Sequence, residues 1–302
     1  MNTTLAERQQ TGPKALVSRH PIAAFLLLAL GSVYLMSIIP ILMTFDVIPG
    51  KAVPARLGID LDRATAGVLT FFLFGSALLV TYLDGGRRAV RQFFRRILRW
   101  RVGIGWWLVA VIALPLLTVI IAVLLGDASA LPSRNVLWRE VLGIAIAFLL
   151  VNLWEEASWA GFMQTRLERR HNFFVAAALT GIPFAAIHMP LQVITGETRS
   201  ALDFAVNFTL LAVLVIIVRS LFGMVMRGAA NSLLLVGLTH TFFNRSNNSD
   251  GIAADILRGG DSRQLAALLA TAVLTVVLGL ILRSRLSRSY RRELDEAEQQ
   301  AY

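Results

Sequence analysis

The chain has 302 residues, of which 56% are hydrophobic and only 16% are charged, and its mean hydropathy is +0.65. A soluble domain carries about 25% charged residues, so this composition excludes a soluble globular protein and favours a bundle of membrane helices. The chain contains no cysteine, which excludes disulfides, thiolate metal sites and a cysteine nucleophile. Its net charge of +10 comes mainly from arginines in short gaps between apolar runs, a pattern that indicates topology signals and anionic lipids rather than nucleic acid.

Membrane-spanning helices need about 20 apolar residues each. Eight stretches of the chain qualify or nearly do so, and together they predict an all-α, polytopic membrane helix bundle with about eight transmembrane helices. In chain order they are Ile22–Phe45, Ala64–Leu83, Val102–Gly126, Val141–Met163, Phe173–Pro190, Phe204–Val218, Gly228–Phe243 and Leu265–Leu282. The sixth and seventh stretches are short and are separated only by residues 219–227.

The distribution of arginine predicts the orientation of the chain. Arginines concentrate in the gap 84–101, in the gaps after the fourth and sixth stretches, and after the eighth. Under the positive-inside rule both termini are then cytoplasmic, which requires an even number of spans. Residues 1–20 are expected to be a cytoplasmic arm, 21–284 the transmembrane domain and 285–302 a basic, polar cytoplasmic tail. The first stretch is too long for a signal peptide and is predicted to be a retained helix.

The basic gap 84–101 also contains apolar residues at helical spacing, among them Val90, Phe93 and Ile97. Arginines surround this apolar stripe. The pattern is typical of a helix that lies in the headgroup layer, and its expected role is anchoring.

A few ionisable or strongly polar residues fall inside the predicted spans, where such groups are costly and mark functional sites. Glu155 and Glu156 belong to the fourth span, His188 to the fifth, and His240 to the seventh, with Asn244 one turn later. With a rise of about 1.5 Å per residue, Glu155, His188 and His240 are expected to reach one buried layer near or beyond the membrane midplane. They are therefore predicted to share one functional site.

Simpler roles exist for the same residues. A buried histidine can merely hydrogen-bond a neighbouring helix. Adjacent glutamates differ by about 100° around a helix, so Glu155 and Glu156 are not expected to face one point. Glu156 is accordingly predicted to be structural, or to be kept neutral by burial.

Two chemistries suit the predicted site. Glu155, His188 and His240 are residue types that bind zinc, which would keep a water in its open position. Alternatively, Glu155 acts as general base on a water held with His188, while His240 and Asn244 stabilise an oxyanion. The second chemistry needs no cofactor. The chain has no His-Glu-x-x-His sequence, which excludes an ordinary zincin.

These residues resemble three short motifs of the CPBP family of intramembrane endopeptidases, which includes the type II CAAX prenyl proteases and bacterial relatives linked to bacteriocin processing or immunity. The glutamate-pair motif corresponds to EEASWAGFMQ, from Glu155 to Gln164. Phe-x-x-x-His is matched by Phe184 and His188, and His-x-x-x-Asn by His240 and Asn244. The order and spacing agree, and the motif-bearing core covers residues 141–244. The family usually has arginine just before the glycine of the first motif, where this chain has Ala160.

The resemblance implies metal-independent hydrolysis of peptide bonds within the membrane, with Glu155, His188, His240 and Asn244 as catalytic residues. Glu156 and Phe184 are then supporting residues, although the loss of the cation at Ala160 questions how Glu156 is held. The expected substrate is a hydrophobic peptide or membrane-protein segment, and the expected location is a bacterial cell membrane. Two other hypotheses stay open: a catalytically silent protein of the immunity type, and a proton-coupled transporter that uses the same glutamate and histidines.

Overall fold

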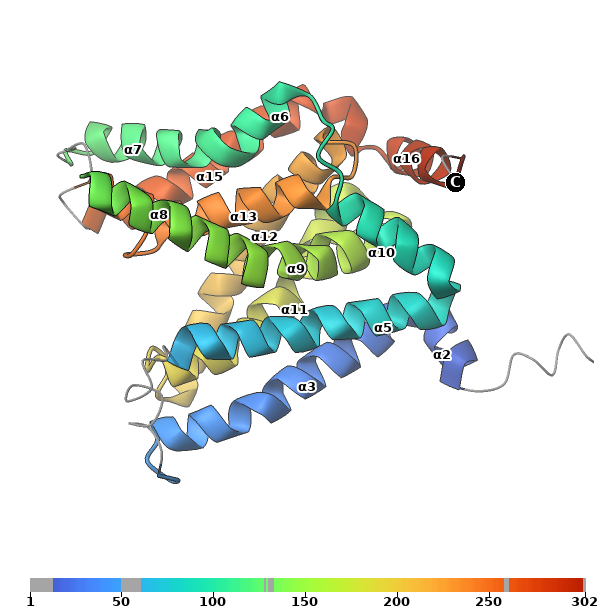
Figure 1. The fold of residues 1–302 in the computed structure, drawn as a ribbon, viewed down its shortest axis with the longest axis horizontal. Coiled ribbons are helices and arrows are strands. Elements are labelled where there is room, and N and C mark those ends of the chain that lie inside the picture. The colour runs from blue at the N-terminus through green and yellow to red at the C-terminus, as the bar shows by residue number, and fades with distance from the viewer. Residues whose placement is uncertain (1–12, 50–60, 128, 130–132, 258–260, 301–302) are drawn as a thin grey trace, which may run out of the picture. The chain divides into compact units, whose positions relative to one another are not determined.

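The computed structural model of the protein describes residues 13–49, 61–127, 129, 133–257 and 261–300. The predicted arm falls partly outside these residues, and its described part, Pro13–Arg19, forms helix α2. The chain divides into two compact units (Figure 1). Residues 1–95 and 187–199 form the first unit, and residues 96–186 and 200–302 form the second.

The predicted all-α, multi-pass architecture is confirmed. Seven helical runs among the described residues are long and apolar enough to cross a membrane. They are Pro21–Thr44, Ala64–Ile97, Ile104–Leu124, Arg134–Glu168, Phe173–Ile194, Ala201–Gly228 and Ser262–Ile281. The predicted seventh span corresponds to helix α13, Leu233–Asn247, which has only 15 residues. The second, fourth, fifth and sixth spans extend beyond their predicted bounds, whereas the third is shorter than predicted.

The first unit contains α3, Pro21–Thr44, and most of α5, Leu61–Ile97. Helix α3 starts on a proline, which suits the first helical turn because the missing N–H has no helical partner there. Its buried residues recur every four positions, at Phe25, Ala29, Val33 and Ser37, so one stripe of the helix is packed and the rest is partly or fully exposed.

Helix α5 consists of two helical segments that meet at a kink. Gly86 has φ 64° and ψ −160°, a conformation that glycine adopts without steric cost. The chain folds back at this glycine, since the rings of Phe74 and Phe93 are stacked with centroids 6.1 Å apart. The segment after the kink is the helix predicted for the basic gap, and its Phe93 and Ile97 are buried. Its predicted place in the headgroup layer stays a prediction.

The second unit holds the remaining helices. Its first long run joins α6, Ile104–Leu108, to α7, Leu114–Leu124, through a π-helical turn. Its second joins α8, Arg134–Ala147, α9, Leu153–Glu156, and α10, Thr165–Glu168, again through π-helical turns. Most of α11, Phe173–Ile194, follows. The chain ends with α12, Ala201–Gly228, α13, α14, Ile252–Ile256, α15, Asp261–Ile281, and α16, Arg288–Gln300.

Helix α13 is the central helix of this unit, in contact with α7, α9, α12 and α15. Gly237 permits its close approach to α9, because a Cβ atom there would lie 2.9 Å from the Cα of Leu153. Ser232 caps the start of α13 by accepting from the N–H of Leu235. The site residues of both helices are thereby brought to one place.

The prediction that residues 219–227 form a gap between two spans is wrong. Helix α12 continues through this segment to Gly228, and Arg219 and Arg227 are both fully buried. The chain turns only afterwards, where Ala230 and Asn231 adopt left-handed conformations with φ 51° and 63°. Because carboxylates on the α9–α10 segment pair with both arginines, these cations are interior contacts and give no information on topology.

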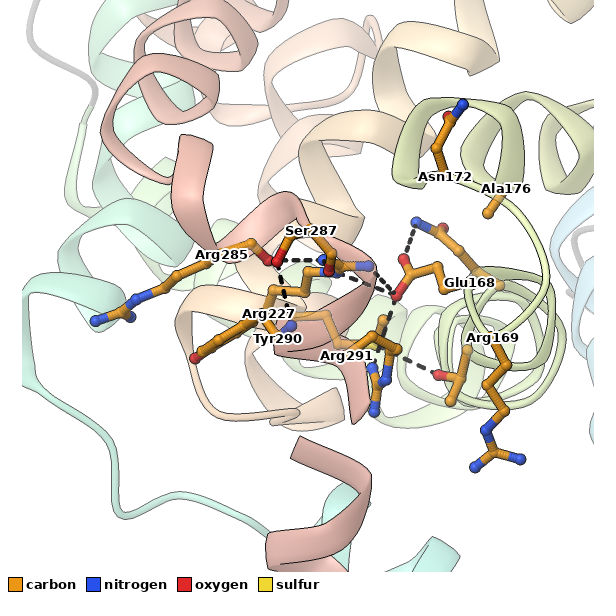
Figure 2. A network of polar contacts seen from close by, with 12 residues as sticks. Glu168, Arg169, Asn172, Ala176, Arg227, Arg285, Ser287, Tyr290 and Arg291 are labelled. Carbon is orange, nitrogen blue, oxygen red and sulfur yellow. Dashed lines mark hydrogen bonds and ion pairs between the residues drawn. The ribbon is translucent and has the colours of Figure 1, made fainter. Parts of the chain in front are cut away.

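The C-terminal segment is an integral part of the second unit rather than a loose tail. Arg291 of α16 is buried and donates to Asn231 at 3.0 Å and to Asp295 at 2.8 Å. It lies 3.7 Å from Glu168, which also pairs with Arg227 (Figure 2). Arg169 completes the network by donating to Asp295.

Candidate active site

Two adjacent glutamates form the centre of the candidate site. Glu155 and Glu156 occupy the short helix α9, which lies between the π-helical turns Phe148–Asn152 and Ala157–Gln164. π-Helical turns widen a helix locally and recur at functional sites. Both glutamates are buried, and the side chain of Glu156 is fully inaccessible to solvent.

His240 of α13 approaches both carboxylates. Its Nδ1 lies 2.9 Å from Oε1 of Glu156 and 3.9 Å from Oε2 of Glu155. The expectation that the two glutamates do not face one point is therefore wrong. Their directions differ around the helix, but an imidazole placed between those directions is within reach of both flexible side chains. The structure thus brings together Glu155, Glu156 and His240, three of the residues that the sequence singled out.

Arg219 of α12 holds Glu156 from the other side, and the sequence analysis missed this role. Its Nη1 donates to Oε1 and Oε2 of Glu156 at 2.7 and 2.8 Å. Neither side chain has any exposed area. Because a guanidinium is always protonated in proteins, the pairing strongly favours the carboxylate form of Glu156. This contradicts the prediction of a neutral Glu156.

The charged groups are surrounded by aromatic rings. The His240 ring lies 5.2 Å from that of Phe222 and 6.2 Å from that of Phe184, measured between centroids. The guanidinium of Arg219 lies 5.5 and 5.6 Å from the same two rings, within the range of cation–π attraction. Trp159 packs edge-on against Phe184 at 5.8 Å. Such an environment has a low dielectric, which strengthens the charge interactions inside it.

Asn244 lies one turn after His240 on α13, as predicted, and it contacts a second asparagine. Its Nδ2 donates to Oδ1 of Asn152 at 3.3 Å, and Nδ2 of Asn152 donates to the hydroxyl of Thr241 at 3.0 Å. Asn152 precedes Glu155 by one turn and is buried. It therefore joins the glutamate helix to the His240 helix. A buried asparagine so close to the glutamate pair was the signal in the sequence that could have identified it.

The remaining motif residues are Phe184, His188 and Ala160. Phe184 contacts His240, Trp159 and Arg219 through its ring, which agrees with a supporting role. His188 lies one turn beyond Phe184 on α11, in the part of this helix that belongs to the first unit. Its membership of the site stays a prediction. Ala160 is fully buried on the π-helical turn that follows the glutamates.

A chain of polar contacts leads away from the glutamates. Arg219 lies 3.5 Å from Oε1 of Gln164, and Nε2 of Gln164 donates to Glu168 at 3.1 Å. Glu168 in turn accepts from Nε of Arg227 at 3.1 Å. The candidate site is thus linked through the second unit to the arginine network that holds α16 (Figure 2).

A metal ion was the alternative centre for this site. Among the residues that the structure describes, no group of three or more histidine, aspartate or glutamate side chains is arranged to hold one. Within the second unit, the oxygens of Glu156 already accept from Arg219, and Oε1 also faces His240. The arrangement as it stands supports acid–base chemistry and electrostatic stabilisation by the protein's own groups.

Comparison with known families finds a match to the family of proteins that the sequence motifs resemble. Residues 137–246 match the family described as "Type II CAAX prenyl endopeptidase Rce1-like". The match includes the glutamate pair, Phe184, His188, His240 and Asn244, so this segment of the multi-pass protein is similar to the CAAX protease family. The chain shows no significant match to a curated protein or to a solved structure. Members of the matched family are intramembrane CAAX endopeptidases.

Proposed function

We propose that this protein is an intramembrane endopeptidase that hydrolyses peptide bonds of a hydrophobic or membrane-associated substrate. The observation that carries the proposal is the buried cluster of Glu155, Glu156 and His240, which lies within the segment that matches the endopeptidase family. Buried carboxylates and imidazoles in a membrane bundle are costly, so their convergence indicates a function.

In the proposed reaction Glu155 is the general base. It removes a proton from a water that His188 helps to hold, and the hydroxide oxygen bonds to the carbonyl carbon of the scissile peptide. The resulting oxyanion accepts hydrogen bonds from His240 and Asn244. When the C–N bond breaks, the protonated Glu155 returns its proton to the leaving nitrogen. No step uses a metal or a covalent intermediate.

Arg219 bears on the alternative of a catalytically silent protein. The reason for that alternative was the missing cation at Ala160, without which Glu156 had no evident partner. Since Arg219 supplies a cation to Glu156 from α12, the departure at Ala160 does not leave the carboxylate unpaired. The intact cluster favours an active enzyme.

The decisive experiment is peptidase activity of the purified protein in detergent or nanodiscs. A library of self-quenched apolar peptides is the probe, and cleavage sites are read by mass spectrometry. We expect hydrolysis of a subset of the peptides. If no peptide is cleaved but the reconstituted protein moves protons across vesicles, the transporter hypothesis replaces the proposal.

We also propose that α13 crosses the membrane as an eighth span, with both termini in the cytoplasm of a bacterial cell. The central position of α13 in the second unit supports this. Because the chain has no cysteine, single cysteines report on topology without background. A maleimide that does not cross membranes is expected to leave Thr3→Cys and Ser289→Cys unlabelled in intact cells and to label both after permeabilisation. Labelling of one terminus in intact cells would contradict an even number of spans.

A further inference from the structure

The buried arginine of α12 has a geometry that goes beyond pairing one charge with another. Nη1 of Arg219 contacts both oxygens of Glu156, and one of these oxygens, Oε1, also lies 2.9 Å from Nδ1 of His240. Arg219, Glu156 and His240 therefore form a line of contacts from three helices, α12, α9 and α13. Because Glu156 is a carboxylate and only accepts, Nδ1 of His240 must be the donor.

From this geometry we infer that Arg219 is a positioning residue of the active site. It orients Glu156, and Glu156 in turn fixes the ring of His240 with Nδ1 protonated, which leaves Nε2 for the substrate. The inference rests on the proposed function in one respect only, the use of Nε2 on the oxyanion. The orientation itself is a property of the resting protein.

The charges of the cluster explain why a cation is required. Glu155 must be ionised to act as a base, and Glu156 is a carboxylate beside it. Two buried carboxylates repel each other and are costly without a counter-charge. Arg219 reduces their joint charge to −1. The proposed hydrogen bond to the oxyanion requires that Nε2 of His240 carries a proton as well as Nδ1.

The guanidinium is held in place by its own surroundings. The rings of Phe184 and Phe222 lie within cation–π distance, and Gln164 lies 3.5 Å from Nη2. Gly223, one turn after Arg219, is needed for this arrangement, because a Cβ there would collide with Nε2 of Gln164. A guanidinium fixed in this way orients Glu156 rather than merely neutralising it.

The position of the cation is a feature of this chain. The first motif has Ala160, one turn after Glu156, at the place where a cation was expected. Here the charge comes from a different helix, 63 residues away from Glu156 in sequence. In this chain Glu156 is therefore supported from α12 rather than from its own motif.

The test compares Arg219→Gln and Arg219→Lys with a matched control, Arg227→Gln. Arg227 is equally buried on the same helix and pairs with Glu168 instead of the glutamates of the site. Peptide hydrolysis gives kcat and KM, and ¹⁵N NMR of histidine-labelled protein reports which ring nitrogens are protonated. The chain has only four histidines, and His240→Gln assigns the signal of interest.

We expect Arg219→Gln to lower kcat by about 10–100-fold, by analogy with the loss of residues that orient metal-bound histidines, with KM little changed. The ¹⁵N signals of His240 should change as well. Arg219→Lys should lie between Arg219→Gln and the wild type, and Arg227→Gln should keep the kcat and the His240 signals of the wild type. If Arg219→Gln does not fold, the double variant Glu156→Gln with Arg219→Gln, which removes both charges, should fold and still turn over slowly.

Three results would overturn the inference. The first is a normal kcat with unchanged His240 signals in Arg219→Gln. The second is an equal loss of kcat in Arg219→Gln and Arg227→Gln with His240 unchanged, which indicates a merely structural ion pair. The third is a double variant with wild-type turnover. If the wild type cleaves no peptide, the proposed function fails, and the NMR comparison alone decides whether Arg219 orients His240.

Discussion

Replacing Arg291 with methionine tests whether α16 is a structural part of the second unit. Methionine keeps the apolar length of the side chain and removes the guanidinium, so packing is largely preserved. The change deletes hydrogen bonds to Asn231 and Asp295, and it removes a cation 3.7 Å from Glu168 (Figure 2). The Arg291→Met variant and the wild type are compared under identical detergent conditions.

The expected cost follows from these contacts. Hydrogen bonds that involve a charged group are worth about 1.5–3 kcal/mol each, and two of them are lost. Glu168 keeps Arg227 as a partner, and Asp295 regains water, so the loss stays toward the lower end of the sum. We expect the free energy of unfolding to fall by about 3–4 kcal/mol.

The assay is unfolding in mixed micelles as the fraction of denaturing detergent rises, with hydrogen exchange of α16 as a second readout. Arg292→Met is the matched control, because Arg292 is the next residue of the same helix and is exposed. We expect the control to match the wild type within about 0.5 kcal/mol. A loss below about 1 kcal/mol for Arg291→Met, or equal losses in both variants, would refute the reasoning.

Three further predictions concern the site and the network. Asn244→Ala should slow turnover by roughly 10²–10³ with little change in substrate affinity, because an oxyanion donor acts in the transition state; a near-normal rate beside an inactive His240→Ala would favour a proton relay or a metal site. Prolonged chelation should leave peptide hydrolysis intact and the purified protein should contain no stoichiometric zinc, whereas loss of activity with recovery on adding zinc would assign Glu155, His188 and His240 as ligands. Burial raises the pKa of Asp295, but the charge of Arg291 and the hydrogen bond and charge of Arg169 outweigh it and lower the pKa below its usual value. The stability that Asp295 contributes is therefore present above the unfolded-state pKa of about 3.9 and lost as the pH falls through the lower folded value, so the difference in unfolding free energy between wild type and Asp295→Asn should shrink in acid. A difference independent of pH would contradict the ion pairs.

The membrane architecture could be predicted from the sequence because each long apolar run carries its own signal. Composition and run length identify such helices without knowledge of their neighbours. The seventh predicted stretch corresponds to α13, which has only 15 residues and so falls short of the length that a span usually needs. The proximity of Glu155 and His240 could be anticipated from their similar estimated depths in the membrane. The closer contact of His240 with Glu156 could not.

The role of Arg219 and Arg227 could not be read from their own surroundings in the sequence. An arginine at the end of an apolar run is usually a topology signal, and both were interpreted in that way. Their partners, Glu156 and Glu168, lie about 60 residues earlier on another helix.

The central claim, that Glu155 is the base of a hydrolytic site, is tested most directly by Glu155→Gln. Glutamine keeps the size and hydrogen bonding of the side chain but does not accept the proton of the attacking water. Turnover of a cleaved peptide should fall by about 10²–10⁴ or more, while membrane insertion and folding persist. The control Glu293→Gln removes an exposed carboxylate of α16 and should keep the full rate. Turnover of Glu155→Gln equal to that of the control would contradict the account.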